Sequence, residues 1–432
     1  MQLSYNRVTE NIKKIFYEGL LRMLKTKTKF LRLALGGILC GSLILHQPAL
    51  IFASEESAAS VTPVPDPHTE YYTQAAKSDS IEGWPAGPSV EAQSAIVLDL
   101  STNTVLYSKN PNTELYPASI TKIMTALLGC ENLDFDSPIT ISESAAYGIE
   151  AGSSSIYGDA GEVFTPEQVL MGLMLESANE MALAISEEVS GSTKKFVELM
   201  NERARQLGCG HTHFNNPHGL PDETHYTSAY DMAKIARAAW FNPLFRKFVT
   251  TNYFEIPPTN KFTETRYLLN HHEMMPTHKY AYDGVLGGKT GYTTKAGSTL
   301  VTYALRDDMA LVVVVMNTLS GGWSDTAALL DYGFGNFQHA AVPVEKEPVP
   351  VKTLPSEKYI LNNCGNTFPF FYQTGVTVTV PNGTDLSGLT TKQTFLNNKA
   401  GPSRLRINYY YNDQRVGISY LYERNILSSL LQ

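Results

Sequence analysis

Cysteine is scarce in this chain of 432 residues, which contains Cys40, Cys130, Cys209 and Cys364. So few cysteines in so long a chain exclude a disulfide-stapled scaffold. None of them lies in a local pattern typical of a catalytic thiol. We therefore interpret the cysteines beyond the N-terminal segment as small, buried apolar residues.

Positive charge is also scarce beyond the first 32 residues. The whole chain has 34 Lys or Arg against 42 Asp or Glu, a formal net charge of −8. Residues 1–32 contain eight basic residues and two glutamates, a net charge of +6, so the other 400 residues carry −14. Because phosphate binding needs clustered Lys and Arg, this balance argues against nucleic acid as a partner.

The proportions of apolar and charged residues are those of a globular protein. Apolar residues make up 43% of the chain and charged residues 18%. This composition can bury a core, and it excludes a mainly disordered or collagen-like chain. The length exceeds the roughly 100 to 200 residues of one ordinary domain, so it predicts two folded units with tails.

One uncharged, apolar run, residues 33–53, directly follows the basic N-terminus. A basic flank, an apolar run and a small residue, here Ala53, are typical of an export signal. About twenty residues can also span a bilayer as an uncleaved anchor. We expect residues 1–53 to be a signal peptide, cleaved near Ala53, or an N-terminal membrane anchor, with translation starting at Met1 or Met23. The protein should therefore act outside the cytoplasm, in the cell wall or on the outer face of the membrane.

The rest of the chain divides into a linker and two predicted domains. Residues 54–90 contain five prolines and little periodicity, which indicates an exported linker. Residues 91–341 begin with a strand hairpin at 95–107, become helical over 117–191, and end with a second hairpin of apolar, β-branched runs at 298–316. This order predicts an α+β domain in which helices cover an antiparallel sheet.

For residues 342–432 the pattern of apolar and polar residues predicts a small all-β domain. Their first part, Val342–Val351, is an extended, proline-punctuated linker. The segments 376–380, 405–411 and 416–421 then alternate apolar and polar residues with a period of two, as strands do.

Local signals mark the ends of two helices in the first domain. Thr165, Pro166 and Gln168 resemble a capping box with proline at the first helical position. Gly191 fits the end of that helical stretch, and a further helix is expected to run to Leu207.

The first motif with chemical potential is Ser119-Ile-Thr-Lys122. At this spacing both side chains share one helix face. A serine hydroxyl becomes a good nucleophile when a neighbour removes its proton, and a desolvated lysine can do so because burial lowers its pKa. Ser192 and Lys195 have the same spacing, so the motif alone does not identify a site.

Two further motifs follow along the chain. Ser177-Ala-Asn179 lies at a break between helices, where a hydroxyl can relay a proton and an amide can hold a substrate carbonyl. A helix cap explains the same residues equally well. Lys289-Thr290-Gly291 occurs once, and a strand edge with a cation, a hydroxyl and a glycine lets an extended peptide lie alongside.

Together the three motifs are far more specific than each alone. Ser177 follows Ser119 by 58 residues, and Lys289 follows Ser177 by 112. In this order and spacing the chain strongly resembles the low-molecular-mass penicillin-binding proteins of serine peptidase family S11, which act as D-alanyl-D-alanine carboxypeptidases. The resemblance covers everything after the linker, and it implies a β-lactamase/transpeptidase-like fold followed by a small β domain.

The resemblance implies a role for each motif residue. Ser119 would be the nucleophile, Lys122 its general base, and Ser177 the proton shuttle to the leaving amine. Asn179 would orient the substrate amide. Lys289 and Thr290, beside Gly291, would bind the terminal carboxylate, and the backbone N–H groups of Ser119 and Tyr292 would form the oxyanion hole.

The resemblance also implies partners. The substrates would be peptidoglycan stem peptides ending in D-Ala-D-Ala, and β-lactam antibiotics would acylate Ser119. The N-terminal segment would provide any membrane association, and no cofactor is implied. Relatives usually end in an amphipathic helix on the membrane, whereas residues 426–432 provide about two turns without a basic face. We therefore expect anchoring through the N-terminus or release.

Several alternatives remain at this point. Six histidines lie between His211 and His272, but no HExxH motif is present, so we expect no metal site. His218 and Asp231 more plausibly brace the site, or are a turn residue and a helix-start carboxylate. A class A β-lactamase would need an ExxLN pattern, which residues 180–288 lack. A non-catalytic wall-binding protein that has kept the fold is the alternative from another class.

Overall fold

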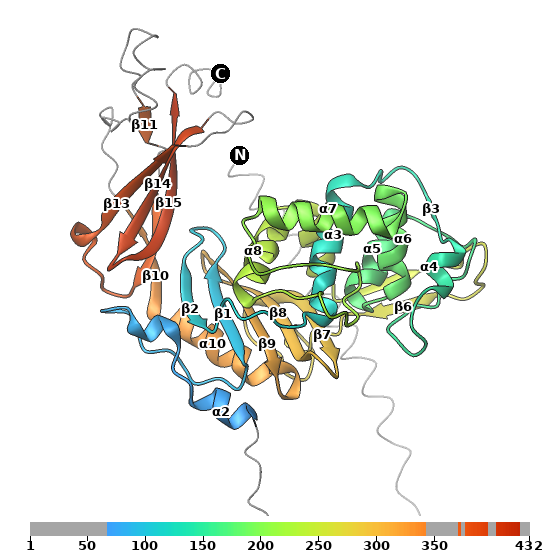
Figure 1. Cartoon of the computed structure of the whole chain (residues 1–432), viewed down its shortest axis with the longest axis horizontal. Coiled ribbons are helices and arrows are strands. Elements are labelled where there is room, and N and C mark those ends of the chain that lie inside the picture. The colour runs from blue at the N-terminus through green and yellow to red at the C-terminus, as the bar shows by residue number, and fades with distance from the viewer. Residues whose placement is uncertain (1–66, 343–369, 373–375, 396–402, 424–432) are drawn as a thin grey trace, which may run out of the picture. The chain divides into compact units, whose positions relative to one another are not determined.

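The computed structural model of this chain describes residues 67–342, 370–372, 376–395 and 403–423 (Figure 1). All of these residues belong to one compact unit, Val64–Gln432. The predicted signal or anchor, the start of the linker and most of the extended segment 342–351 lie outside the described residues.

The centre of the fold is a five-stranded antiparallel sheet in the order β2-β1-β9-β8-β7. The two predicted hairpins are therefore confirmed, with β8 and β9 in the interior of the sheet and β7 at one edge. The bounds are β1 Ser94–Asp99, β2 Val105–Lys109, β7 Val285–Thr293, β8 Gly297–Arg306 and β9 Met309–Thr318.

Both faces of this sheet are covered, which explains its unbroken apolar strands. Successive side chains of a strand point to opposite faces. Val312 and Val314 of β9 accordingly join the core under the helical region, whereas Val313 and Val315 join the core under α10. Helices α3, α5, α6 and α7 gather beside the sheet (Figure 1), and the predicted α+β arrangement of helices on an antiparallel sheet is confirmed. The helix bounds are α2 Pro67–Thr73, α3 Lys122–Asn132, α4 Glu143–Tyr147, α5 Pro166–Leu175, α6 Asn179–Ser190, α7 Thr193–Gln206, α8 Ala229–Trp240, α9 Pro243–Val249 and α10 Trp323–Asn336.

The predicted helix signals are present in the structure. Thr165 Oγ1 accepts from Gln168 N–H while the Gln168 side chain accepts from Thr165 N–H, which completes the capping box at the start of α5. Gly191 ends α6 with a φ of 72°, a left-handed conformation that glycine adopts without steric cost. Ser192 caps α7.

The expectation of continuous helix over 117–191 is wrong for residues 133–162. This stretch contains α4, strand β3 (Ile139–Thr140) and loops, and it leads into β4 (Val163–Phe164). Its last part is rich in serine and glycine and has positive φ values at Gly152, Tyr157 and Gly161, which interrupt a helix.

The ordered part of the chain begins earlier than the sequence indicated. Residues 67–90, assigned above to the linker, contain α2 and a 3-10 turn at Lys77–Ser80. Trp84 is 7% exposed, its indole N–H donates to Leu106 O at 2.6 Å, and its ring lies 5.0 Å from that of Phe337. One buried tryptophan thus attaches this proline-rich stretch to the main core.

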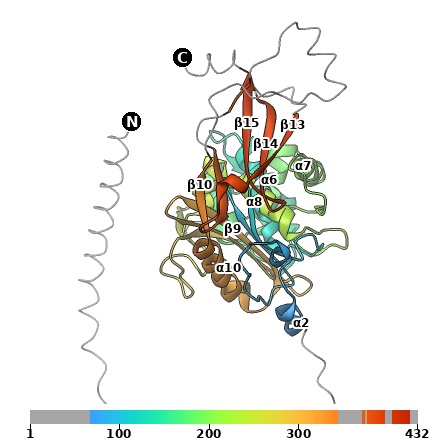
Figure 2. The same ribbon diagram turned by 90° about the vertical axis from the view of Figure 1, so that its left-hand side faces the viewer.

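A second sheet of four antiparallel strands lies near the C-terminus. Its order is β11-β15-β14-β13, and Figure 2 shows β13, β14 and β15 side by side. The β14–β15 turn, Asn412-Asp413, has positive φ at both residues, as a type I′ hairpin requires. The bounds are β11 Phe370–Tyr372, β13 Thr390–Phe395, β14 Ser403–Tyr411 and β15 Gln414–Glu423.

The predicted strand at 376–380 does not belong to this second sheet. It forms β12 (Thr377–Pro381), which pairs with β10 (Phe337–Ala341) directly after α10. Val378 and Val380 join the same apolar cluster as Leu329 and Leu330 of α10. The predicted domain boundary at residue 342 therefore falls between two paired strands.

A buried ion pair lies where β1, β10 and β12 meet. His339 Nε2 is 2.7 Å from Asp99 Oδ2, and Thr379 Oγ1 donates to the same oxygen at 3.0 Å. Burial acts to raise the pKa of Asp99, but hydrogen bonds from His339, Thr102 and Ser101 outweigh it, so the pKa lies below the ordinary 3.8. The hydrogen bond to Asp99 raises the pKa of His339 above 6.5.

This ion pair predicts a pH-dependent stability difference. We expect His339→Gln, which can keep a hydrogen bond to Asp99 but loses the charge, to lower the melting temperature more near pH 5 than near pH 9. Folding raises the pKa of His339, so its contribution is complete below about pH 6.5 and disappears as the pH rises through the folded-state value. Thermal unfolding of both proteins at the two pH values measures the difference, and an equal loss at both would contradict this account.

Candidate active site

Ser119 lies in a 3-10 turn, η2 (Ala118–Thr121), that leads directly into α3. The preceding Ala118 has a φ of 51°, a strained value for a residue with a Cβ atom. Gly219 makes this conformation possible, because a Cβ atom there would lie 1.9 Å from Ala118 O. Ser119 itself is half-buried. The turn therefore holds Ser119 at the start of a helix with its side chain accessible.

Lys122, one turn further on, is completely buried. Its Nζ lies 3.1 Å from Ser119 Oγ, 2.7 Å from Asn179 Oδ1 and 2.7 Å from His218 O. Burial lowers the pKa of Lys122 well below its ordinary 10.5, and the charge of Lys289 adds to this effect, while Glu180 opposes it. A lysine that loses its proton more easily than usual, next to a serine hydroxyl, can act as a base.

Ser177 and Asn179 lie at the junction of α5 and α6, as the sequence indicated. Ser177 has a φ of 59° and is 5% exposed, and its Oγ has no hydrogen-bond partner among the described residues. Burying a hydroxyl without a partner is costly, so its position two residues before Asn179, which contacts Lys122, is typical of a functional position.

Lys289, Thr290, Gly291 and Tyr292 lie on β7, the edge strand of the five-stranded sheet. Lys289 is 2% exposed, and its Nζ donates to Thr290 O at 3.0 Å. Burial lowers the pKa of Lys289 to about 7, although Glu176 acts in the opposite direction. The Tyr292 side chain is 70% exposed. The edge strand thus carries a buried lysine whose charge a neighbouring anion would favour.

Gly291 is the point where this edge meets the serine turn. A Cβ atom at this position would lie 2.4 Å from Thr299 Oγ1 and 2.8 Å from Ser119 N. Thr299 Oγ1 cannot simply rotate away, because it donates to Pro117 O at 2.9 Å. The absence of a side chain at 291 therefore allows β7 to pack directly against the backbone of Ser119.

This contact predicts the effect of one added methyl group. We expect Gly291→Ala to lower the free energy of unfolding by about 1–3 kcal/mol, as overpacking does, and to slow any reaction at Ser119. The matched control is Gly335→Ala, since a Cβ atom there meets nothing within 4 Å. Chemical denaturation and a rate assay on both variants measure the effects; equal behaviour of the two would contradict the packing argument.

The two residues proposed above to brace the site, His218 and Asp231, make different contacts. His218 contacts Lys122 through its backbone carbonyl. Burial, with the charges of Lys122 and His225, lowers the pKa of its ring to about 3, so the ring is neutral near pH 7. Asp231, in contrast, accepts from His211 N at 2.6 Å and from Thr212 Oγ1 at 3.0 Å, and it pairs with Lys234. It therefore fixes the turn at residues 211–212.

Two carboxylates near the site were not predicted from the sequence. Glu176 directly precedes Ser177, pairs with His271 at 3.0 Å and interacts with Lys289. Glu180 directly follows Asn179 and is fully buried. A glutamate in the first turn of a helix normally indicates a favourable dipole interaction at the surface, so no sequence pattern indicates the burial of Glu180.

Within the residues that the structure describes, no three His, Cys, Asp or Glu side chains come close enough to hold a metal ion. None of the described helices is long and apolar enough to cross a membrane.

Comparisons with known proteins agree on one family. Residues 82–320 match the family model of peptidase S11, described as D-alanyl-D-alanine carboxypeptidase. DacF, a D-alanyl-D-alanine carboxypeptidase of Bacillus subtilis, is 37% identical over 257 residues, which are 57% of this chain and 63% of DacF. DacB2 of Mycobacterium tuberculosis is 33% identical over 271 residues, which are 60% of this chain and 86% of DacB2. The chain thus spans less than two thirds of the length of DacF.

Solved structures show the same relationship. Penicillin-binding protein 5 of Haemophilus influenzae aligns with a TM-score of 0.61 at 26% identity, over 78% of this chain and 98% of that one. The DD-transpeptidase of Streptomyces K15 aligns with a TM-score of 0.55 at 30% identity, over 58% of this chain and all of that one. The family match covers more than half of the residues and contains all three motifs, so the chain belongs to the peptidase S11 family of D-alanyl-D-alanine carboxypeptidases.

Proposed function

We propose that this chain is a serine-type D-Ala-D-Ala carboxypeptidase that removes the terminal D-alanine from peptidoglycan stem pentapeptides. The observation that carries the proposal is the 3.1 Å contact between Ser119 Oγ and the buried Nζ of Lys122. This pair faces Asn179 on one side, and β7, with Lys289, packs against its turn on the other. A nucleophile, a base and a carboxylate-binding cation are what this reaction needs.

In the proposed acylation, Ser119 Oγ attacks the carbonyl carbon of the penultimate D-alanine, and its proton passes to the neutral amine of Lys122. The N–H groups of Ser119 and Tyr292 stabilise the negative charge that develops on the carbonyl oxygen. The bond to the terminal D-alanine then breaks, and Ser177 Oγ relays a proton to the leaving amine, assisted by Lys289. Water finally hydrolyses the ester on Ser119 and regenerates the hydroxyl.

The substrate is proposed to lie along β7 as an additional strand. Its terminal carboxylate would meet Lys289 and Thr290, and its amide would meet Asn179. The pKa of the free Lys289 is about 7, and a bound carboxylate would favour the charged form of this lysine. β-Lactams would acylate Ser119 in the same position, because like the peptide they present an amide carbonyl near a carboxylate, and the lactam ring strains that amide.

We place this reaction outside the cytoplasmic membrane, where peptidoglycan lies. Residues 1–53 would be the signal peptide or anchor, 54–90 the lead-in, 91–341 the catalytic domain and 342–432 the β-rich domain. The burial of Trp84 supports a catalytic unit that includes the last part of the lead-in.

The test is release of D-alanine by the exported protein. A peptide ending in D-Ala-D-Ala should release its last residue, whereas the same peptide ending in D-Ala-L-Ala should not. No release from either peptide by a folded protein would overturn the proposal.

A further inference from the structure

Glu180 binds a neighbouring loop through its side-chain carboxylate. It follows Asn179 in the first turn of α6 and is fully buried. Its Oε1 accepts from Ser155 Oγ at 2.8 Å and from the backbone N–H groups of Ile156 at 2.7 Å and Gly158 at 3.4 Å. One carboxylate oxygen thus accepts from three donors within residues 155–158, a segment that has no regular secondary structure.

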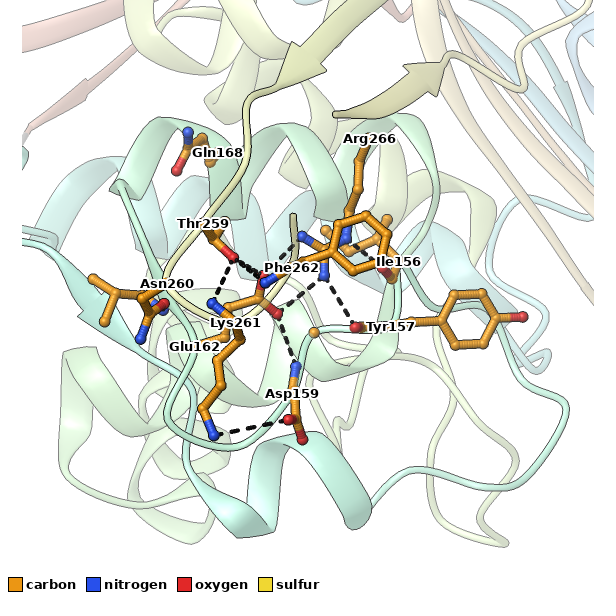
Figure 3. Close-up of polar contacts among 12 residues, drawn as sticks. Ile156, Tyr157, Asp159, Glu162, Gln168, Thr259, Asn260, Lys261, Phe262 and Arg266 are labelled. Carbon is orange, nitrogen blue, oxygen red and sulfur yellow. Dashed lines mark hydrogen bonds and ion pairs between the residues drawn. The ribbon is translucent and has the colours of Figure 1, made fainter. Parts of the chain in front are cut away.

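Arg266 contacts the same segment by donating hydrogen bonds to the segment's backbone carbonyl groups. It lies on β6 (Arg266–Leu269), which pairs with β5 (Tyr253–Ile256). Its Nε donates to Ile156 O at 3.0 Å and its Nη2 to Tyr157 O at 3.2 Å, as Figure 3 shows. We call residues 154–158 the 154–158 loop: Glu180 binds its donors and Arg266 its acceptors.

Arg266 is itself fixed in place. Its guanidinium forms two hydrogen bonds to the fully buried Glu162, at 2.8 and 3.0 Å, and lies 4.2 Å from the ring centroid of Phe262 (Figure 3). Burial acts to raise the pKa of Glu162, but hydrogen bonds from Arg266, Thr259 and Asp159 N–H outweigh it and lower the pKa. A bidentate pair of this kind gives a rigid, directed set of donors.

The 154–158 loop connects Glu180 and Arg266 to the proposed catalytic residues. Ser154 O accepts from the backbone N–H of Asn179 at 2.8 Å. Asn179 Oδ1 in turn accepts from Lys122 Nζ at 2.7 Å. The N–H groups at the start of a helix lack partners within the helix, so a loop that satisfies one of them also fixes the position of the helix end.

We propose that Glu180 and Arg266 are positioning residues, which hold the 154–158 loop and thereby keep Asn179 and Lys122 in the arrangement that acylates Ser119. This inference rests on the proposed function, since it concerns the same reaction. A displacement of about 1 Å in such an arrangement can cost about 100-fold in rate. Neither residue touches Ser119.

Two substitutions of Glu180 separate anchoring from charge. Glu180→Gln keeps an oxygen that accepts from Ile156 N–H and Ser155 O–H, and its amide nitrogen replaces Oε2, which has no partner among the described residues. Glu180→Ala removes the anchor. Both remove the negative charge near Lys122. We expect the second-order rate constant for acylation by benzylpenicillin to fall about 10- to 100-fold in the alanine variant and less than about 3-fold in the glutamine variant.

Testing Arg266 requires a second substitution at Glu162. Removing Arg266 alone would leave the buried Glu162 carboxylate unpaired, which would itself destabilise the fold. We therefore use Arg266→Leu together with Glu162→Gln. This double variant should slow acylation about as much as Glu180→Ala. Combining all three changes should slow acylation little further, because Glu180 and Arg266 act on the same loop. If each change instead damaged the structure independently, the losses in rate would multiply. Arg203→Ala, which breaks the surface ion pair between Arg203 of α7 and Glu131 at the far end of α3, is the control and should acylate at the wild-type rate.

The outcomes are distinct. Folded Glu180→Ala protein that acylates as fast as wild type would overturn the inference, and so would a glutamine variant as slow as the alanine one, because charge would then be the cause. If the wild-type protein itself fails to react, the proposed function fails instead. Thermal unfolding of each variant shows that the folded protein is being compared.

Discussion

Ser119→Ala should reduce D-alanine release by about 10⁴-fold or more, because the substitution removes the only atom that forms the proposed ester. The fold should be preserved, because the Ser119 side chain is only half-buried and its hydrogen bond is to Lys122 Nζ. A chromogenic assay for D-alanine measures the loss. The binding contacts at Lys289 and Thr290 remain in this variant, so the protein should still bind the peptide.

The matched control for this prediction is Ser192→Ala. Ser192 has the same SxxK spacing to Lys195, but the structure shows it as the N-cap of α7, where its Oγ accepts from Lys195 N. Its removal should cost about 1 kcal/mol of stability, as the loss of a helix cap does, and leave D-alanine release unchanged. Release that persists in Ser119→Ala, or disappears in Ser192→Ala, would contradict the assignment.

Lys122→Met should lower the acylation rate by about 10²- to 10⁴-fold, the usual contribution of a general base. Methionine fills the buried space without a charge, so the fold should tolerate it better than a truncation. Lys122→Arg should be as inactive, because a guanidinium stays protonated and cannot accept the proton of Ser119.

The pH dependence gives the Lys122 prediction a second readout. Burial lowers the pKa of this amine well below 10.5, and only its neutral form can accept a proton. The wild-type acylation rate should therefore rise with pH through the folded-state pKa of Lys122. The residual rate of Lys122→Met should not show this rise. Stopped-flow acylation with a chromogenic β-lactam over a range of pH measures both, and an unchanged pH profile in the variant would assign the base to another group.

Signals that lie within a few residues of one another predicted much of the fold. The capping box at Thr165 and the glycine end at Gly191 each depend on local hydrogen bonds or on one φ angle. The three motifs also predicted that distant segments meet, because their order matches a family. Lys122 and Asn179 indeed lie 2.7 Å apart at Nζ and Oδ1.

Features that depend on distant partners were not predicted. Strand β12 looked like part of the C-terminal sheet, yet it pairs with β10, and nothing in its alternating pattern specifies which strand it meets. The lead-in looked like a linker because it has five prolines and little periodicity, although Trp84 and Val90 are buried in the core. Glu180 could not be recognised because its partners, residues 155–158, form a loop without a sequence pattern.

The central claim is that Ser119 is the nucleophile, and mass spectrometry of the protein after exposure to benzylpenicillin tests it most directly. We predict one penicilloyl group on the peptide that contains Ser119, absent in Ser119→Ala and retained in Ser192→Ala. An adduct on another residue, or no adduct on the folded wild-type protein, would contradict the claim.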